Sequence, residues 1–190
     1  MGLTIEKCIE GWTNSLKQLK IKADIVFFGD SLTYYGDFAS VFPNKVVCNL
    51  GLKGDTLDGM MDRIEQVRLV QPQKVFLMAG INDVAKCEFD VFQERYNALL
   101  IALRGQLPLA EIIVQSLLPV NDFDFSIGCT NTQIIRCNEV IYYLCDKYAL
   151  EYLDLYNQNV QDNLLPKELT VDGIHLSTDA YEHWYNMLKS

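Results

Sequence analysis

Short apolar runs alternate along the chain with longer segments in which apolar residues recur every three or four positions. The runs are rich in β-favouring residues and stop at glycine, proline or polar residues, so they predict buried strands. The predicted strands cover residues 25–28, 46–50, 74–80, 111–117 and 152–155. Strands that alternate with helices over short connections predict a parallel sheet with helices on both faces.

The three-to-four spacing predicts helices that are apolar on one face. In chain order, the apolar stripes are Ile5, Cys8, Ile9, Trp12, Leu16 and Leu19; Leu57, Met60, Met61, Ile64 and Val67; Phe92, Tyr96, Leu99 and Leu103; Cys137, Val140, Ile141, Leu144 and Tyr148; and Tyr181, Trp184 and Leu188. We expect the first helix to cover the sheet and Trp12 to lie in the core. Asp55 or Thr56 is the expected N-cap of the second helix, and Gly105 with Pro108 is expected to end the third.

The connections between parallel strands are right-handed and bring the C-terminal ends of all strands to one edge of the sheet. Two loops at this edge, residues 119–131 and 156–171, are longer than the connections need. Loops of this length are functional or disordered, and at the edge where open α/β sheets bind ligands we interpret them as walls of a substrate pocket. The chain shows no internal repeat or linker, so we expect one domain over residues 1–190.

Composition narrows the choice of partners. The chain has 49% hydrophobic and 22% charged residues, as an ordinary globular domain does, and a formal charge of -9. Nucleic acids and anionic membranes need clustered Lys and Arg, and no such cluster occurs, so we expect neither as a partner. Six scattered cysteines without a CxxC pair predict buried free thiols rather than a disulfide framework or a metal site.

The N-terminal segment has no basic stretch followed by an apolar one, so we expect no signal peptide. No apolar run approaches the length that spans a membrane. We therefore expect a cytoplasmic protein, unless a leader has been removed from the chain.

Residues of complementary chemistry follow the strand ends. Ser31 follows the first predicted strand, Gly54 the second and Asn82 the third, while Asp172 and His175 precede the last helix. A serine hydroxyl becomes nucleophilic when an imidazole takes its proton, and the imidazole needs a partner that fixes its tautomer. The tetrahedral intermediate needs hydrogen-bond donors, which a glycine N–H and an asparagine NH₂ can supply. These segments therefore contain every part of a serine acyl-transfer site.

Elimination identifies the histidine, because the chain has only two. His183 lies off the apolar stripe of the last helix, where we expect a solvated surface residue. His175 lies just before that helix, and Asp172 can fold back across Gly173 to reach it.

With these segments the chain resembles the SGNH hydrolases, also called GDSL esterases or lipases. Four blocks match in family order over most of the chain: Gly29-Asp30-Ser31-Leu32, Asn49-x-Gly51-x-x-Gly54-Asp55-Thr56, Gly80-x-Asn82-Asp83 and Asp172-x-x-His175. One triplet alone is weak, whereas the four together are specific. Ile81 stands where the third block often has threonine, and the GxSxG pattern of ordinary α/β-hydrolases is absent.

The resemblance implies that Ser31 is the nucleophile, His175 the general base and then acid, and Asp172 the residue that orients His175. It implies an oxyanion hole made of the N–H groups of Ser31 and Gly54 and the side chain of Asn82, with no cofactor and no metal. The implied fold is a flavodoxin-like three-layer α/β/α sandwich with a parallel five-stranded sheet of order 2-1-3-4-5.

Several residues beside these blocks have both a structural and a chemical interpretation. Asp30 is interpreted first as a helix cap or loop brace, with tuning of the nucleophile as the alternative. Asp55 is likewise interpreted first as a helix cap, Asp83 as a support of its own loop and Asn49 as a holder of the glycine loop. Lys53 is either a solvated loop residue or a contact for an anionic substrate.

Aromatic residues near this edge are candidates for substrate binding. Tyr34 and Tyr35 either line the pocket or form the buried face of a short helix. Phe123 and Phe125 lie in the longer loop beyond a strand end, so we expect them in the pocket wall.

The leading hypothesis is a serine esterase that removes short, acetyl-type acyl groups through an acyl-enzyme, with O-acetylated carbohydrates as candidate substrates. A thioesterase or lysophospholipase would use the same machinery on longer acyl chains. A non-catalytic carbohydrate- or acyl-binding module is the alternative from another class. A phosphate or flavin binder is disfavoured, because Asp30 stands where a phosphate-binding loop needs bare backbone. The oligomeric state does not follow from the sequence.

Overall fold

The structure, a computed structural model, describes residues 5–125 and 127–189, with side chains from Gly11 onward. Its centre is a parallel five-stranded sheet of order β2-β1-β3-β4-β5. The strands are β1 (Ile25–Gly29), β2 (Val47–Gly51), β3 (Lys74–Met78), β4 (Glu111–Gln115) and β5 (Glu151–Leu153). The predicted strand order and three-layer α/β/α architecture are confirmed.

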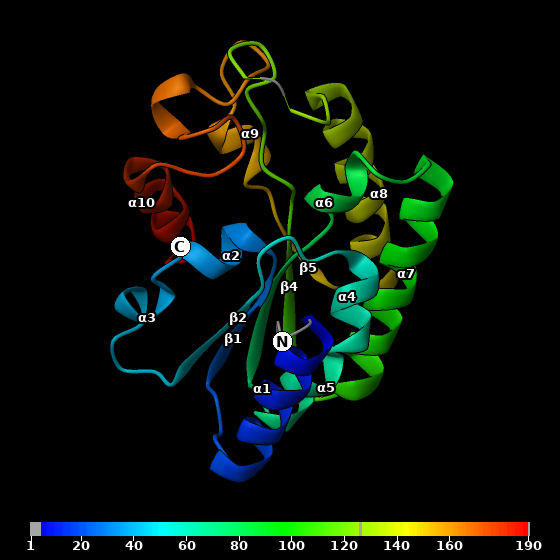
Figure 1. The fold of residues 1–190 in the computed structure, drawn as a ribbon, viewed down its shortest axis with the longest axis vertical. Coiled ribbons are helices and arrows are strands. Elements are labelled where there is room, and N and C mark those ends of the chain that lie inside the picture. Colours follow the sequence, from blue (N-terminus) through cyan, green and yellow to red (C-terminus); the bar gives the residue numbers. More distant parts are fainter. Residues whose placement is uncertain (1–4, 126, 190) are drawn as a thin grey trace.

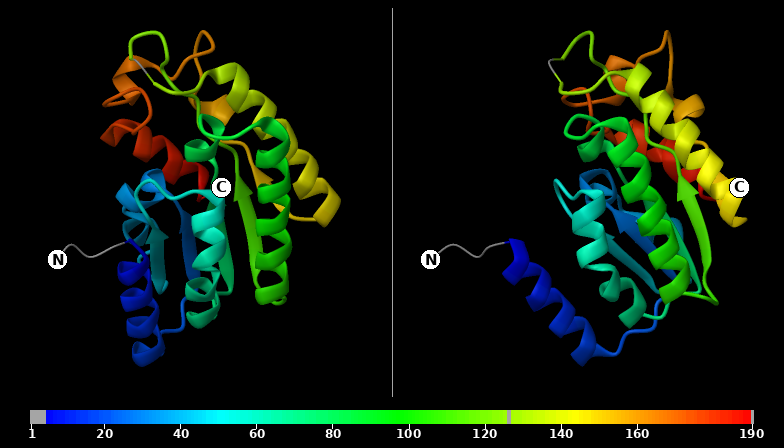
Figure 2. Two further views of the ribbon diagram at one scale, coloured as in Figure 1. Left: turned by 45° about the vertical axis from the view of Figure 1, so that its right-hand side comes forward. Right: turned by 90° about the vertical axis from the view of Figure 1, so that its right-hand side faces the viewer.

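Helices connect the strands and cover both faces of the sheet (Figure 1). They are α1 (Ile5–Leu19), α2 (Ser31–Tyr35), α3 (Phe38–Val41), α4 (Leu57–Asp62), α5 (Ile64–Leu69), α6 (Ile81–Val84), α7 (Phe89–Gln106), α8 (Asn131–Tyr148), α9 (Tyr156–Asn159), η1 (a 3₁₀ turn, Lys167–Leu169) and α10 (Thr178–Met187). The helices α4, α5, α7 and α8 pack on one face, and α3 and α10 pack on the other (Figure 2).

The two faces of the sheet form two separate cores, because side chains alternate between the faces along a strand. Val26 and Phe28 of β1 point into the larger core, under α4, α5, α7 and α8. Ile25 and Phe27 point into the smaller core, which α3 and α10 cover. Since both faces are covered, β1 reads as an unbroken apolar run rather than an alternating one.

Stacked aromatic rings fill the smaller core. The ring of Phe27 stacks on Phe38 with centroids 3.8 Å apart and on Phe76 with centroids 4.8 Å apart. Trp184 of α10 is fully buried against Phe38 and donates its indole N–H to the side-chain oxygen of Gln115 at 2.7 Å. The stack fixes α3 and α10 on the sheet, close to the end of β1.

The prediction for the first helix is wrong in part. Trp12 is 44% exposed rather than buried in the core, and Leu19 is also exposed. The helix packs against α5, and Leu16 is the residue of its stripe that packs against the larger core. An amphipathic stripe predicts a helix with one apolar face, but it does not say how deeply that face is covered. The side chains of Ile5, Cys8 and Ile9 lie outside the described residues.

Two predicted helices differ in their bounds. The stripe of residues 57–67 is divided into α4 and α5 at Arg63, which has non-helical backbone angles and whose side chain binds the carbonyl groups of Gly29 and Leu50. Gly105 does not end α7, which runs to Gln106 and stops just before Pro108. A residue that precedes proline is disfavoured in a helix, so proline sets this end.

Three strands stop two residues earlier than predicted, at Met78, Gln115 and Leu153. After β3 the chain turns at Gly80, whose φ of 115° lies in the left-handed region that favours glycine. After β4 the hydroxyl group of Ser116 accepts the N–H groups of Leu155 and Tyr156, each at 2.9 Å. The turn at Gly80 and the hydrogen bonds of Ser116 thus lie where β3 and β4 end and the loops of the site begin.

The predicted loop of residues 156–171 contains α9 and the 3₁₀ turn, so it is partly helical. The described cysteine side chains are free thiols; Cys129, Cys137 and Cys145 are buried, as predicted, whereas Cys48 and Cys87 are only partly buried. None of the helices in residues 5–125 and 127–189 has the length and apolar character of a membrane span.

Phe27→Ala should destabilise the fold, because it removes the central ring of the stack and leaves a cavity between α3 and the sheet. We expect the free energy of unfolding, measured by urea denaturation, to fall by about 3–5 kcal/mol. Leu109→Ala is the control: Leu109 is 97% exposed, so its loss should change stability by less than about 0.5 kcal/mol. Equal effects of the two substitutions would contradict the described packing.

Candidate active site

Ser31 lies at the C-terminal end of β1 and is the first residue of α2. The turn that presents it needs a glycine at Gly29, since a Cβ there would lie 2.0 Å from the Thr33 hydroxyl oxygen and 2.6 Å from the Met78 carbonyl oxygen. Ser31 is buried except for 8% of its surface. The chain therefore holds this hydroxyl group in a fixed place at the edge of the sheet.

His175 joins Ser31 to Asp172. Its Nε2 atom lies 2.9 Å from the Ser31 hydroxyl oxygen, and its Nδ1 atom lies 2.7 Å from a carboxylate oxygen of Asp172. A carboxylate accepts from Nδ1–H, so the lone pair of Nε2 faces the serine hydroxyl. The structure thus brings the three predicted triad residues together in the order that proton transfer from the serine needs.

The loop before α10 makes this geometry possible. Asp172 folds back so that its second carboxylate oxygen accepts the N–H groups of Ile174 and His175 at 3.1 and 2.8 Å. Gly173 between them has a φ of 93°, and a Cβ there would lie 2.9 Å from the carbonyl oxygen of Asn121. Partial burial of Asp172 opposes ionisation, but these hydrogen bonds and that from the His175 ring outweigh it and lower the pKa of Asp172.

The predicted oxyanion donors lie on the neighbouring loops. Ser31 is the first residue of α2, so its N–H has no partner within the helix. Gly54 follows β2 with a φ of 72° and open space beside it. Asn82 lies in α6, and its Nδ2 donates to the carbonyl oxygen of Asp55 at 2.8 Å, which fixes the orientation of the amide and leaves a second N–H.

The comparisons with known proteins agree with this geometry. The model of the GDSL-like lipase/acylhydrolase family matches residues 27–183. This chain belongs to that family. It is therefore a serine ester hydrolase of the GDSL type. A search of curated proteins found no match.

Solved structures share the fold of this GDSL-type hydrolase. One named for platelet activating factor, from Streptococcus pneumonia, has 24% identity and a TM-score of 0.85 over 97% of this chain and 92% of that one. A GDSL-like lipase from Bacteroides thetaiotaomicron has 20% identity and a TM-score of 0.79 over 95% of each chain. The lipase/acylhydrolase from Enterococcus faecalis has 22% identity and a TM-score of 0.73 over 86% of this chain and 92% of that one.

Asp30 of this hydrolase caps α2, the first of its two predicted roles. One carboxylate oxygen accepts the N–H of Leu32 at 2.9 Å, and the other has no hydrogen-bond partner among the described residues. Complete burial raises the pKa of Asp30 to about 7, although the hydrogen bond from Leu32 opposes the shift. A carboxyl group that titrates near neutrality therefore lies beside the nucleophile.

The interpretation of Asp55 as a helix cap is wrong. Thr56 caps α4, since its hydroxyl accepts the N–H of Gly59 at 3.2 Å. Asp55 instead forms a buried ion pair with Arg63 at 2.6 Å. Asp55 forms an ion pair rather than a helix cap because Arg63, eight positions further along the chain, brings a cation to its carboxylate.

Asp83 and Asn49 hold the site loops, as predicted. Asp83 accepts the N–H of Leu57 at 3.0 Å and so ties α6 to α4. Burial raises the pKa of Asp83 to about 6, against the hydrogen bond from Leu57. Asn49 donates to the carbonyl oxygens of Thr33 and Gly36 at 2.8 and 3.0 Å.

Arg63 was missed by the sequence reasoning. It is 1% exposed, and its guanidinium group lies over the ring of Phe28 at 4.4 Å. The available signal was its position: with Met60, Ile64 and Val67 it falls on one apolar stripe, where a charged residue needs a buried partner.

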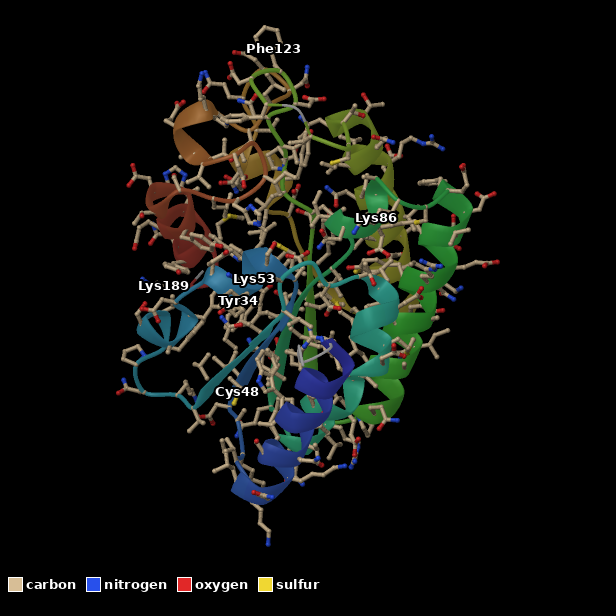
Figure 3. The ribbon with its side chains drawn as sticks, viewed as in Figure 1. Tyr34, Cys48, Lys53, Lys86, Phe123 and Lys189 are labelled. Atoms are coloured by element: carbon tan, nitrogen blue, oxygen red, sulfur yellow. The ribbon has the colours of Figure 1, made fainter. Side chains whose placement is uncertain are left out.

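The predicted substrate-binding residues fall in two places. Tyr34 and Tyr35 are 44% and 52% exposed, so they are not the buried face of α2. Tyr35 meets the ring of His175 edge-on at 5.7 Å, and the Lys53 ammonium lies 4.5 Å from the Tyr35 ring. The same ammonium lies 4.7 Å from the ring of Tyr34 (Figure 3).

Phe125 is half-buried, and a Cβ added to Gly173 would lie 2.8 Å from the Phe125 Cβ, so Phe125 supports the loop of the triad. Phe123 is 84% exposed at the tip of its loop, away from Tyr34 and Lys53 (Figure 3). The roles of Phe123 and Phe125 in substrate binding both stay predictions. His183 is exposed on α10, as expected. Within residues 5–125 and 127–189, no group of three His, Cys, Asp or Glu side chains is arranged to hold a metal ion.

Stability should depend on pH through Asp30. Its pKa rises from 3.8 to about 7 on folding, so the folded state binds the proton more tightly, and the free energy of unfolding falls as pH rises from about 4 to about 7. Asp30→Asn keeps an oxygen for the Leu32 N–H but does not ionise. Relative to wild type, this variant should gain on the order of 4 kcal/mol between pH 4 and pH 8.

Urea denaturation of wild type and Asp30→Asn at pH 4 and pH 8 measures this change. Asp83, whose pKa is also raised, is present in both proteins, so its effect on the pH dependence of stability cancels. Asp62→Asn, at an exposed position at the end of α4, is the control and should show no comparable change. If the stability difference between Asp30→Asn and wild type were the same at both pH values, Asp30 would not carry the linkage.

Proposed function

We propose that this hydrolase cleaves short-chain, acetyl-type esters through an acyl-enzyme, with Ser31 as the nucleophile. The observation that carries the proposal is the position of His175, within hydrogen-bond distance of both Ser31 and Asp172. Ser31 and His175 lie 144 positions apart in the chain. A purely structural histidine would need neither the serine hydroxyl on one nitrogen nor the carboxylate on the other.

The geometry supports two linked steps. In the first, the Ser31 oxygen attacks the ester carbonyl while His175 takes the hydroxyl proton, and the alcohol then leaves with that proton. In the second, His175 takes a proton from water, whose oxygen attacks the acyl carbon, and then returns that proton to the Ser31 oxygen as the acid is released. Asp172 stabilises the imidazolium in both steps, and the N–H groups of Ser31, Gly54 and Asn82 stabilise the oxyanion.

The substrate class is proposed from the surroundings of the triad. Tyr34 and Tyr35 expose aromatic surface beside His175, and aromatic rings of this kind suit the apolar faces of a sugar. An O-acetylated carbohydrate would place its acetyl group at Ser31 and its ring against these tyrosines. Net acidity and the lack of a cationic cluster favour such a neutral substrate over an anionic membrane lipid.

A thioesterase or lysophospholipase activity on longer acyl chains is the second candidate. A cavity of about 450 Å³ is lined by Val84, two residues after Asn82 in the chain, and combines the apolar ring of Phe89 with charged residues that include Lys86, Glu88 and Arg136. An acyl chain that reached this cavity would bury its methylene groups there, with about 0.8 kcal/mol gained for each.

Ser31→Ala and His175→Ala should each lower kcat for p-nitrophenyl acetate by at least about 10³-fold, because each removes a participant in proton transfer. His183→Ala is the matched control, since it removes the other histidine from an exposed site and should leave kcat unchanged. Full activity of Ser31→Ala would refute the assigned nucleophile. A well-folded wild type without any turnover would favour a binding module.

The preferred acyl length should distinguish the two activities. With p-nitrophenyl esters from acetate to palmitate, the short-chain esterase predicts the highest kcat/KM for acetate and a steady fall with length. A rise in kcat/KM with each added methylene would instead establish the longer acyl pocket. Arg136→Trp, at an exposed position of α8 in the lining of this cavity, should then reduce that rise and leave acetate hydrolysis unaffected.

A further inference from the structure

Arg63 binds the ends of two strands at once. Its Nη2 donates to the carbonyl oxygen of Gly29 at 2.9 Å, and its Nη1 donates to that of Leu50 at 2.8 Å. Gly29 is the last residue of β1, two positions before Ser31, and Leu50 lies near the end of β2, whose loop carries Gly54. The guanidinium group thus spans the two points from which the nucleophile and the glycine loop extend.

The third contact of Arg63 leads to the remaining oxyanion donor. Its Nε donates to a carboxylate oxygen of Asp55 at 2.6 Å, and the main-chain carbonyl oxygen of Asp55 accepts from Asn82 at 2.8 Å. Asp55 is also the neighbour of Gly54. Gly54 and Asn82, the predicted donors outside α2, are therefore each linked through Asp55 to the same buried cation.

We propose that Arg63, paired with Asp55, is a positioning residue that sets the distances between Ser31, Gly54 and Asn82 in the oxyanion hole. This inference rests on the proposed function. It assigns Arg63 no contact with substrate, since the side chain is buried under the sheet edge. Its effect passes through the backbone of Gly29 and Asp55.

A guanidinium group is specifically suited to this role. Its planar fork presents donors in several fixed directions, so one side chain reaches three acceptors on different segments. The ammonium group of lysine is a compact charge on a flexible stem and cannot hold all three in the same geometry. A misplacement of about 1 Å among catalytic groups costs as much as 10²-fold in rate.

The test is the kinetics of Arg63→Lys, which keeps the buried charge beside Asp55 but loses the fork. We expect kcat/KM for p-nitrophenyl acetate to fall by about 10- to 100-fold, measured well below the melting temperature and per folded molecule. The affinity for phenylboronic acid, whose adduct with Ser31 is tetrahedral and anionic, should fall by a similar factor. A merely structural role would leave both quantities unchanged in the folded fraction.

Val67→Ala is the matched control, since Val67 is fully buried in α5 and makes none of the Arg63 contacts. It should lower the melting temperature but leave the activity of the folded protein unchanged. In an Asn82→Ala background, Arg63→Lys should cost much less activity than in wild type, because the two residues serve one oxyanion hole. Fully additive losses, or wild-type activity in folded Arg63→Lys, would overturn the inference.

If Arg63→Lys does not fold, Asp55→Asn provides the same test, since it keeps the acceptor oxygen and removes the charge of the pair. Its losses of activity and boronate affinity should be parallel and again non-additive with Asn82→Ala, and additive losses overturn the inference. Ser31→Ala distinguishes a failure of the proposed function from a failure of the positioning role of Arg63. Its full activity refutes the proposed function, whereas an inactive Ser31→Ala beside a fully active Arg63→Lys refutes only the positioning role.

Discussion

Parallel pairing of β1 with both of its neighbours is the constraint on which the site depends. In the register of the sheet, Gly29 stands opposite Gly51 of β2 and Met78 of β3. Three strands therefore end at one level, and their loops start from adjacent points with the same direction. Each connection between parallel strands runs back along the sheet through one or more helices. Loops that are far apart in the sequence therefore lie side by side at the same edge. The catalytic geometry is in this sense a property of the sheet edge, to which the α10 loop adds the histidine and its aspartate.

An edge of this kind concentrates buried polar groups, and each needs a partner. Asp30, Asp55, Arg63 and Asp83 lie around the site, and all four are almost completely buried. Asp83 and Arg63 bind backbone groups of other segments, Asp30 and Asp55 each accept a nearby backbone N–H, and Asp55 and Arg63 also neutralise each other. Such groups are costly to bury, so they add less to stability than apolar residues of equal size. What they add is a unique arrangement of loops, since carboxylate and guanidinium groups bind well only when their acceptors and donors are in place.

Local signals in the sequence predicted the strands and the residues that the structure brings together at the sheet edge, whereas the strand order followed from the resemblance to the SGNH hydrolases. Short apolar runs define the strands, and His175 was identified because only one other histidine exists. The predictions that were wrong concern the surroundings of individual side chains. The stripe that contains Trp12 predicts a helix correctly but not the partial cover that α5 provides. The roles of Asp55 and Arg63 depend on carbonyl groups of Gly29 and Leu50, which enter the same space only after the sheet has formed.

The pKa of Asp30 shows how the folding constraint and the chemistry meet. Its carboxyl group caps α2 and is sealed from solvent by the same packing that orients Ser31. Burial raises the pKa of this group to about 7, so its negative charge appears only as the pH approaches and passes neutrality. Asp172 differs because its hydrogen bonds from the His175 loop favour the carboxylate. The pKa values of two aspartates beside Ser31 and His175 are thus shifted in opposite directions, and the difference follows from what each carboxyl group contacts.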